Sequence, residues 1–100
     1  MKNMTKVCED VREIMHEWHT PKAERILHEM GVSKRNWRML MQHAGFADGH
    51  SWSYRQIAAA EDRGLSHVRV FQIVRKTRLR LWRYLSQKGY EPVHFGRRIA

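Results

Sequence analysis

The segment from Tyr54 to Leu85 constrains the fold of this chain more than any other stretch. It reads YRQIAAAEDRGLSHVRVFQIVRKTRLRLWRYL, in which a short helix-forming stretch ends at Gly64 and a long basic stretch begins at Ser66. Glycine adopts left-handed backbone angles at low cost, so Gly64 favours a sharp turn between two helices. A short helix, a turn and a longer helix form the layout of a helix-turn-helix, whose second helix enters the major groove of DNA.

Hydrophobic spacing predicts three further helices upstream of this segment, and no strand. Apolar residues recur every three or four positions over about residues 4–18, as on one face of a helix. Thr20 then suits the N-cap of a second helix, and Pro21 its first position, where a missing N–H costs nothing. Gly31 suits the end of that helix, and Ser33 the start of a third. We therefore expect an all-α chain of about five helices, with a C-terminal helix-turn-helix and a long basic recognition helix.

The same spacing predicts which residues line the core. Ser53 and Gln56 have the spacing of a capping box, which would open the shorter helix of the pair. The residues expected to face inward include Val11, Ile14, Met15, Ile26, Leu27, Met30, Trp37, Leu40, Met41, Ile57, Val70, Ile73, Thr77, Leu81 and Tyr84 or Leu85. We expect a helical extension over residues 1–31, a helix-turn-helix domain over 32–88 and a basic tail over 89–100.

The positive charge of the chain is concentrated in its second half. The formal net charge is +9. Residues 1–50 contain eight Lys/Arg and seven Asp/Glu, whereas residues 51–100 contain eleven and three. Counterions that leave phosphates on binding favour the association of such basic surfaces with nucleic acid, so the charge points to a polyanionic partner. A merely solvated basic surface is the alternative interpretation.

Two stretches carry a family resemblance: VSKRNWRMLMQHAGF, and SYRQIA followed by GLSHVRVFQI. They are similar to the first conserved part and to the helix-turn-helix of region 4 of bacterial sigma factors, the module that contacts the promoter −35 element. The resemblance spans about residues 32–85. It implies an all-helical fold, DNA contact through the last helix and a dock on RNA polymerase, which in sigma factors is the flap tip of the β subunit.

The chain departs from this family in ways that bear on its target. The segment between Ile57 and Gly64 is two residues longer than the usual spacing, which alters the turn. The positions that match the family's base-reading residues hold His67, Val68, Phe71 and Gln72. His and Gln can hydrogen-bond base edges, whereas Val and Phe can only touch a thymine methyl. Val68 and Phe71 therefore suit DNA, a protein partner or, for Phe71, the core.

The cations on the last predicted helix have no acid among them. Like charges at helical spacing repel one another, so an anionic partner is their natural compensation. Ser66, His67, Arg69 and Gln72 would face the DNA groove. The cations further along the helix, Arg75, Lys76, Arg78 and Arg80, would hold phosphates or an acidic surface of polymerase. The residues expected to bind DNA are Arg55, Ser66, His67, Arg69, Gln72, Arg75, Lys76, Arg78 and Arg80.

Other sites find little support in the sequence. Cys8, His16 and His19 could share one side of the first helix, but zinc sites use tight pairs such as Cys-x2-Cys, which are absent from the sequence. We therefore expect no metal and no cofactor. A Gly-rich phosphate loop, a Ser-His-Asp order and a carboxylate pair are equally absent, so we expect neither an enzyme nor a small-molecule substrate.

Composition also indicates in which cellular compartment the protein is expected. With 42% apolar residues the chain should fold rather than stay disordered. No apolar run approaches the roughly 20 residues that span a bilayer, so we expect no membrane partner. The single cysteine suits a reducing compartment, and the first ten residues lack the apolar centre of a signal peptide. A cytoplasmic location is the expectation.

These observations favour a small transcription regulator of phage or mobile-element type, which contacts promoter DNA together with RNA polymerase. A second hypothesis is an adaptor or sigma mimic that binds polymerase, as in antitermination or host takeover, without reading sequence. In that case Val68, Phe71 and Met41 would contact protein. A third is a packaging protein with affinity for any duplex.

Overall fold

A computed structural model describes residues 4–61 and 64–88, with side chains described from Glu9 onward. Within these ranges the chain is all-helical and strand-free, as expected. The predicted basic tail, residues 89–100, lies outside the described residues. The helices are α1 (Met4–His16), α2 (Pro21–Met30), α3 (Lys34–Ala44), α4 (Tyr54–Ala60) and α5 (His67–Gln87).

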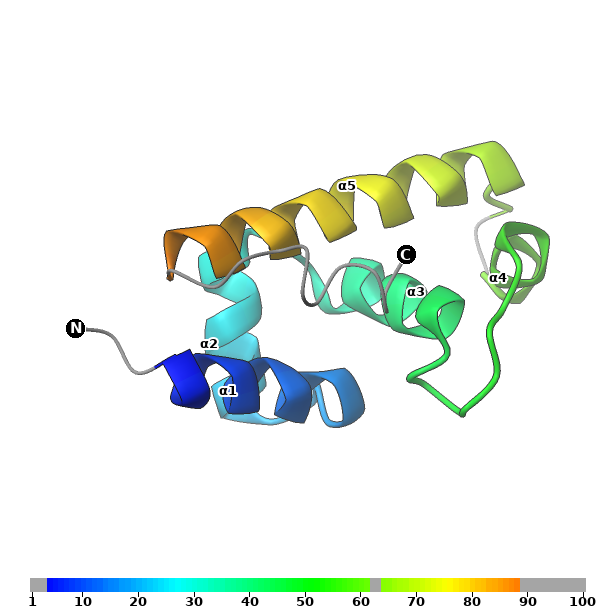
Figure 1. Ribbon diagram of the computed structural model, residues 1–100. Coiled ribbons are helices and arrows are strands. Elements are labelled where there is room, and N and C mark those ends of the chain that lie inside the picture. Colours follow the sequence, from blue (N-terminus) through cyan, green and yellow to red (C-terminus); the bar gives the residue numbers. More distant parts are fainter. Residues whose placement is uncertain (1–3, 62–63, 89–100) are drawn as a thin grey trace.

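The longest helix, α5, runs along one side of the molecule, and the other helices lie on its inner side (Figure 1). Both α3 and α4 pack against α5, and α2 touches it near the opposite end from α4. In this view α4 is seen almost end-on, whereas α5 lies across the picture. The N-terminal end of α5 thus stands next to α4, and its C-terminal part next to α2.

Side-chain caps explain where the helices begin. In α2, α3, α4 and α5 a Ser or Thr oxygen accepts a hydrogen bond from the backbone N–H three residues on, at 3.1 Å in all four. At α4 the capping box is complete, because the Ser53 N–H also donates to Gln56 Oε1 at 2.8 Å. Such caps stabilise a helix by about 1 kcal/mol each. The cap residues are Thr20, Ser33, Ser53 and Ser66.

The hydrophobic core is continuous through all five helices. Trp37 lies at its centre with none of its side chain exposed, and its Nε1 donates to the backbone oxygen of Ile14 at 2.8 Å. That bond joins α3 to α1. The only buried polar side chain among the described residues, Thr77, is satisfied because its hydroxyl donates to the Ile73 carbonyl at 2.7 Å. The expected inner stripe of α5 is confirmed, with Val74 buried in addition.

Gly64 lies in the connection from α4 to α5 and has a positive φ of 64°. A Cβ at this position would meet nothing within 4 Å, so the cost of a side chain is one of backbone strain alone.

We expect Gly64→Ala to lower the free energy of unfolding by about 1–2 kcal/mol, because L-residues pay that much in left-handed conformation. Urea denaturation measures the loss. Gly64→Asn serves as the matched control and should lose less, since Asn visits this conformation more readily. Equal losses for Ala and Asn would show that φ is not the cause.

Candidate nucleic-acid interface

The exposed surface of α5 is divided into two sides by the helical period. Residues seven and eleven positions apart lie on the same side of a helix of 3.6 residues per turn. Arg69, Lys76 and Arg80 are spaced in this way, next to α2 and the start of α3. The other side carries a mixed set: Val68, Phe71, Arg75, Arg78, Leu79 and Trp82.

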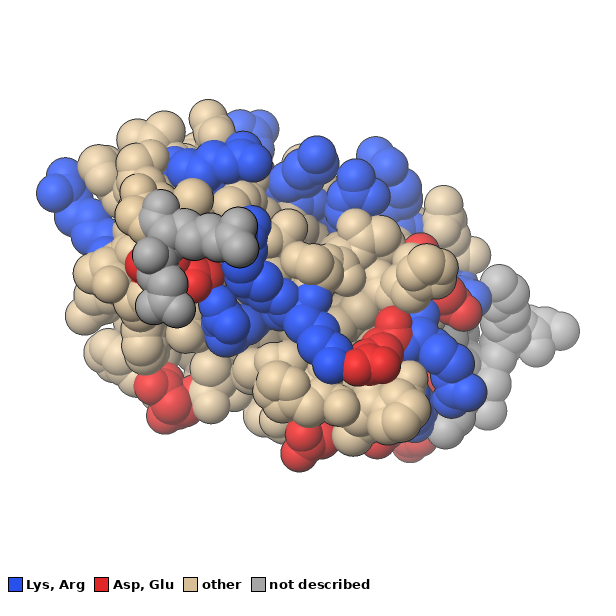
Figure 2. All heavy atoms as spheres, turned by 180° about the vertical axis from the view of Figure 1, so that it is seen from behind, with Lys and Arg blue, Asp and Glu red and all other residues tan. Residues whose placement is uncertain are grey.

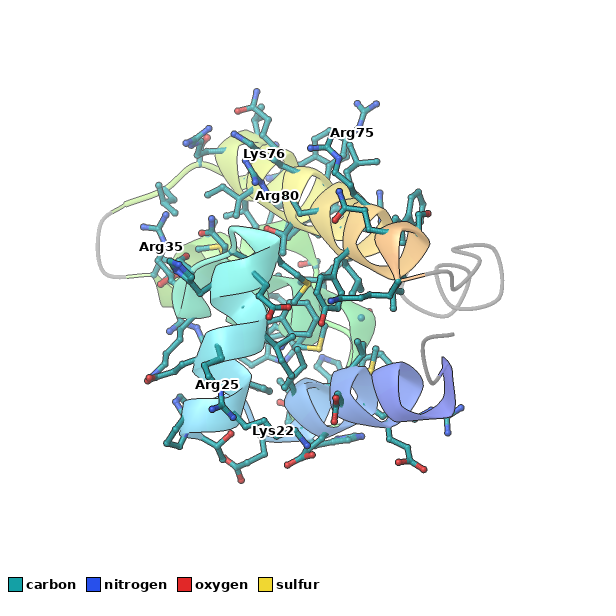
Figure 3. The ribbon with its side chains drawn as sticks, turned by 90° about the vertical axis from the view of Figure 1, so that its left-hand side faces the viewer. Lys22, Arg25, Arg35, Arg75, Lys76 and Arg80 are labelled. Atoms are coloured by element: carbon teal, nitrogen blue, oxygen red, sulfur yellow. The ribbon has the colours of Figure 1, made fainter. Side chains whose placement is uncertain are left out.

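The first side of α5 forms one wall of a groove, which we call the α2–α5 groove. Its opposite wall is the turn between α2 and α3, and its volume is about 210 Å³. In Figure 3, Lys76 and Arg80 project from α5 beside the end of α2. The residues that line the groove are Gly31, Val32, Asn36, Arg69, Gln72, Ile73, Lys76, Thr77 and Arg80.

Gly31 makes room for one of these cations. It ends α2 in left-handed conformation, with a φ of 73°. A Cβ on residue 31 would lie 2.7 Å from Arg80 Nη1, which is shorter than real contacts allow. The missing side chain therefore lets the Arg80 guanidinium lie against the α2–α3 turn.

The second side of α5 combines apolar and basic residues. Val68, Phe71 and Leu79 are 52%, 40% and 46% exposed. Phe71 is nevertheless anchored, because its ring meets the Tyr54 ring edge-to-face with centroids 5.3 Å apart. Tyr54 in turn stacks on His43 of α3 at 4.3 Å. Phe71 is therefore partly exposed rather than part of the core, and its ring contacts the Tyr54 ring.

Arg78 differs from the other cations of α5 in its aromatic neighbour. Like Arg80 it is half-buried, but its guanidinium lies over the Trp82 ring, 5.7 Å from the centroid. A guanidinium held on an indole face gains a cation–π attraction, which competes with a phosphate for it. Arg75 and Lys76 are exposed and have no such neighbour among the described residues.

The ion pairs between described residues use cations outside α5. Lys22 of α2 binds Asp10 at 2.8 Å and Glu13 at 2.7 Å, and these bonds raise the pKa of Lys22 above its ordinary value. The other ion pairs between described residues are Lys34–Glu24, Arg38–Glu61 at 2.7 Å and Lys88–Glu29 at 4.0 Å. Burial, and then the nearby Glu29 carboxylate, raise the pKa of Tyr84 to about 12.

Within the part of the chain that the structure describes, none of the Lys and Arg residues of α5 has an ion pair with an acid. Figure 2 shows Lys and Arg along the upper margin, which α5 forms, while the lower part of this face carries Asp and Glu together with further Lys and Arg. The six cations are Arg69, Arg75, Lys76, Arg78, Arg80 and Arg83.

The structure groups some of the predicted DNA-binding residues and separates others. Arg69, Gln72, Lys76 and Arg80 line the same groove, while Arg75 and Arg78 lie on the second side of α5. The Ser66 hydroxyl accepts from the Arg69 N–H as the N-cap. His67 in the first turn of α5 and Arg55 on α4 are exposed.

Gly31 and Asn36 were absent from the expected set, although they line the groove. The sequence marks Gly31 only as a helix stop. Its closeness to residue 80 arises from packing, so no local pattern reveals it.

Two other regions give less support for a functional site. Trp52 is half-buried beside a shallow hollow and donates from Nε1 to Asp48 Oδ2 at 3.1 Å, so its polar edge is already engaged. Within the described residues, no three His, Cys, Asp or Glu side chains are grouped to hold a metal ion. His16 meets the edge of Phe46 and His19 lies near Trp18, while the Cys8 side chain lies outside the described set.

Comparison with known proteins supplies no family. No family model, no curated protein and no solved structure matches the chain. None of the described helices has the length and apolar character that a membrane crossing requires. The function is therefore inferred from the residues and their geometry.

Proposed function

We propose that this chain is a DNA-binding transcription regulator that contacts promoter duplex through α5, with α4 and α5 acting as a helix-turn-helix like that of sigma region 4. The observation that carries the proposal is the set of six α5 cations without an acidic partner among the described residues. Such a surface gains from releasing the counterions of phosphates, a term large enough to dominate binding at moderate salt.

The first turns of α5 supply the groups for base contact. Gln72 is exposed on the same side as Lys76, and the amide of a glutamine can bind adenine through two hydrogen bonds. His67 and Val68 are exposed in the same turns. Lys76, Arg75 and Arg80 then serve as phosphate contacts along the rest of the helix.

A specific observation favours a second candidate, the polymerase adaptor. Val68, Phe71 and Leu79 expose apolar surface on the second side of α5, which suits a protein partner. Met41 does not belong to this surface. The expectation that it contacts a partner is wrong, because its side chain is 0% exposed in the core under α5.

Selection of binding sites from a random duplex library, followed by salt titration, tests the proposal. A regulator should enrich a preferred site and bind it more tightly than random duplex by about a thousandfold or more. Binding of all duplexes alike would favour the packaging hypothesis. Capture of purified RNA polymerase without any preferred site would favour the adaptor.

We expect Gln72→Ala and Lys76→Ala to separate base contact from phosphate contact. Gln72→Ala should weaken the preferred site by about 1–3 kcal/mol and leave random duplex unchanged. Lys76→Ala should weaken both alike and flatten the salt slope by about one unit. We choose Lys76 rather than Arg78 because the Arg78 guanidinium lies over Trp82. Fluorescence anisotropy over a salt series gives both quantities, and equal losses on both duplexes after Gln72→Ala would contradict base reading.

A further inference from the structure

We propose that the α2–α5 groove is a binding site for a single phosphate group, so that the turn between α2 and α3 belongs to the binding surface. The inference rests on the proposed function for the source of that phosphate, the backbone of duplex DNA. The affinity of the groove for phosphate itself is a separate property that can be measured alone.

The side chains that line the groove are either basic or uncharged. Three cations and the Asn36 amide can hold an anion in the groove; Gln72 also lines it but is assigned to base contact, and none of the described lining residues is a carboxylate. Arg69, Lys76 and Arg80 lie on one side of the same helix, so their positive ends line one wall of the groove. Because no acid among the described residues neutralises them, an anion entering the groove meets uncompensated positive charge.

The opposite wall adds to this field. Asn36 lies in the first turn of α3, whose N-terminal end carries partial positive charge from the aligned peptide dipoles. Arg35 lies beside it and donates to Asn36 Oδ1 at 3.4 Å. Gly31 lets Arg80 approach this wall, because a Cβ on residue 31 would stand only 2.7 Å from Arg80 Nη1. Two elements distant in sequence therefore present donors to one small space.

The size of the groove limits its occupant. Pockets that enclose small organic ligands span about 300–1,000 Å³. At about 210 Å³ the groove is smaller, so it suits a phosphate group rather than a whole nucleotide. The two sources of that chemistry are a backbone phosphodiester and free inorganic phosphate.

The test variant is Asn36→Asp, which places a carboxylate in the groove without changing side-chain size. An acid in the first turn of a helix is favourable, so the variant should fold as the wild type does. Arg25→Gln is the matched control, with the same change of one in the net charge at an exposed position of α2. Figure 3 shows Arg25 at the far end of the molecule from Lys76 and Arg80.

Two readouts use the full chain. In the first, inorganic phosphate is titrated into labelled protein at constant ionic strength, and the amide NMR signals of Val32, Asn36 and Arg69 are followed. We expect saturable shifts in the wild type and in Arg25→Gln, and at least about fivefold weaker binding in Asn36→Asp. In the second, Asn36→Asp should weaken duplex binding about tenfold relative to Arg25→Gln.

The outcomes separate the site from the proposed function. Saturable phosphate binding together with a duplex loss in Asn36→Asp supports a backbone phosphate. Saturable binding with equal duplex affinity in both variants supports the site with free phosphate as its ligand. Saturable binding by a protein that ignores duplex keeps the site and rejects the DNA-binding function. Shifts no larger than those from chloride overturn the site, whatever the duplex shows. If Asn36→Asp misfolds, Arg80→Gln is measured in its place.

Discussion

Reversing the charge of Lys76 and Arg80 together is expected to weaken duplex binding by more than about 100-fold at physiological salt. Hydrogen bonds to charged groups contribute about 1.5–3 kcal/mol each, so the loss of two costs at least about 3 kcal/mol. The two glutamates of Lys76→Glu/Arg80→Glu would also repel the phosphates that the native cations attract. Neither residue has an ion pair within the described chain, so the fold should be unaffected.

A matched double variant shows whether position or total charge matters. Arg12→Glu/Arg25→Glu makes the same change of four in the formal net charge of +9. Both residues are exposed on α1 and α2, and Figure 3 shows Arg25 at the far end of the molecule from Lys76 and Arg80. Binding by this control should fall by less than about tenfold, which reflects long-range attraction alone. Equal losses in the two double variants would contradict an interface on α5.

The largest expected effect on stability is that of Trp37→Ala. The Trp37 side chain is fully buried, and truncation of such a residue typically costs about 3–5 kcal/mol. Domains of this size are stable by only about 5–15 kcal/mol, so the variant should be partly unfolded at moderate temperature. The loss also frees the Ile14 carbonyl that accepts from Trp37 Nε1. Urea unfolding followed by circular dichroism measures it.

Trp37→Phe separates packing from the hydrogen bond. Phenylalanine keeps most of the apolar contact but leaves the Ile14 carbonyl without its donor, which should cost about 1–3 kcal/mol. Trp52→Ala is a second control, because Trp52 is only half-buried. A free energy of unfolding for Trp37→Ala within about 1 kcal/mol of the wild type would contradict the central place of this residue in the core.

Features encoded by neighbouring residues were predictable from the sequence. The four Ser or Thr caps and the capping box at α4 follow from spacings of three residues, and all are present. The inner stripe of α5 followed from the helical period. Met39 and Val74 were not expected inside, yet both are fully buried. In α3 this happens because the helix packs against α2, α4 and α5, which bury more than one of its faces.

The candidate site was only half predictable. Arg69, Gln72, Lys76 and Arg80 share a helix, so their common side follows from periodicity. The other wall of the groove depends on how α2 and α3 pack against α5, which no spacing between neighbours encodes. The expected set did not separate Arg78 from the other cations, although Arg78 and Trp82 are four residues apart on α5. Their cation–π contact therefore follows from the helical period.

The continuous core has a consequence for how the chain can be dissected. Val11, Ile14 and Leu27 are buried in the same cluster as Trp37 and Leu81. A fragment that begins at residue 32 would therefore expose to water the apolar surface that α1 and α2 now cover. Aggregation of such a fragment would be the expected behaviour, so a shortened chain is a poor reagent for DNA assays. Point substitutions in the intact chain are the appropriate means of assigning roles to its two halves.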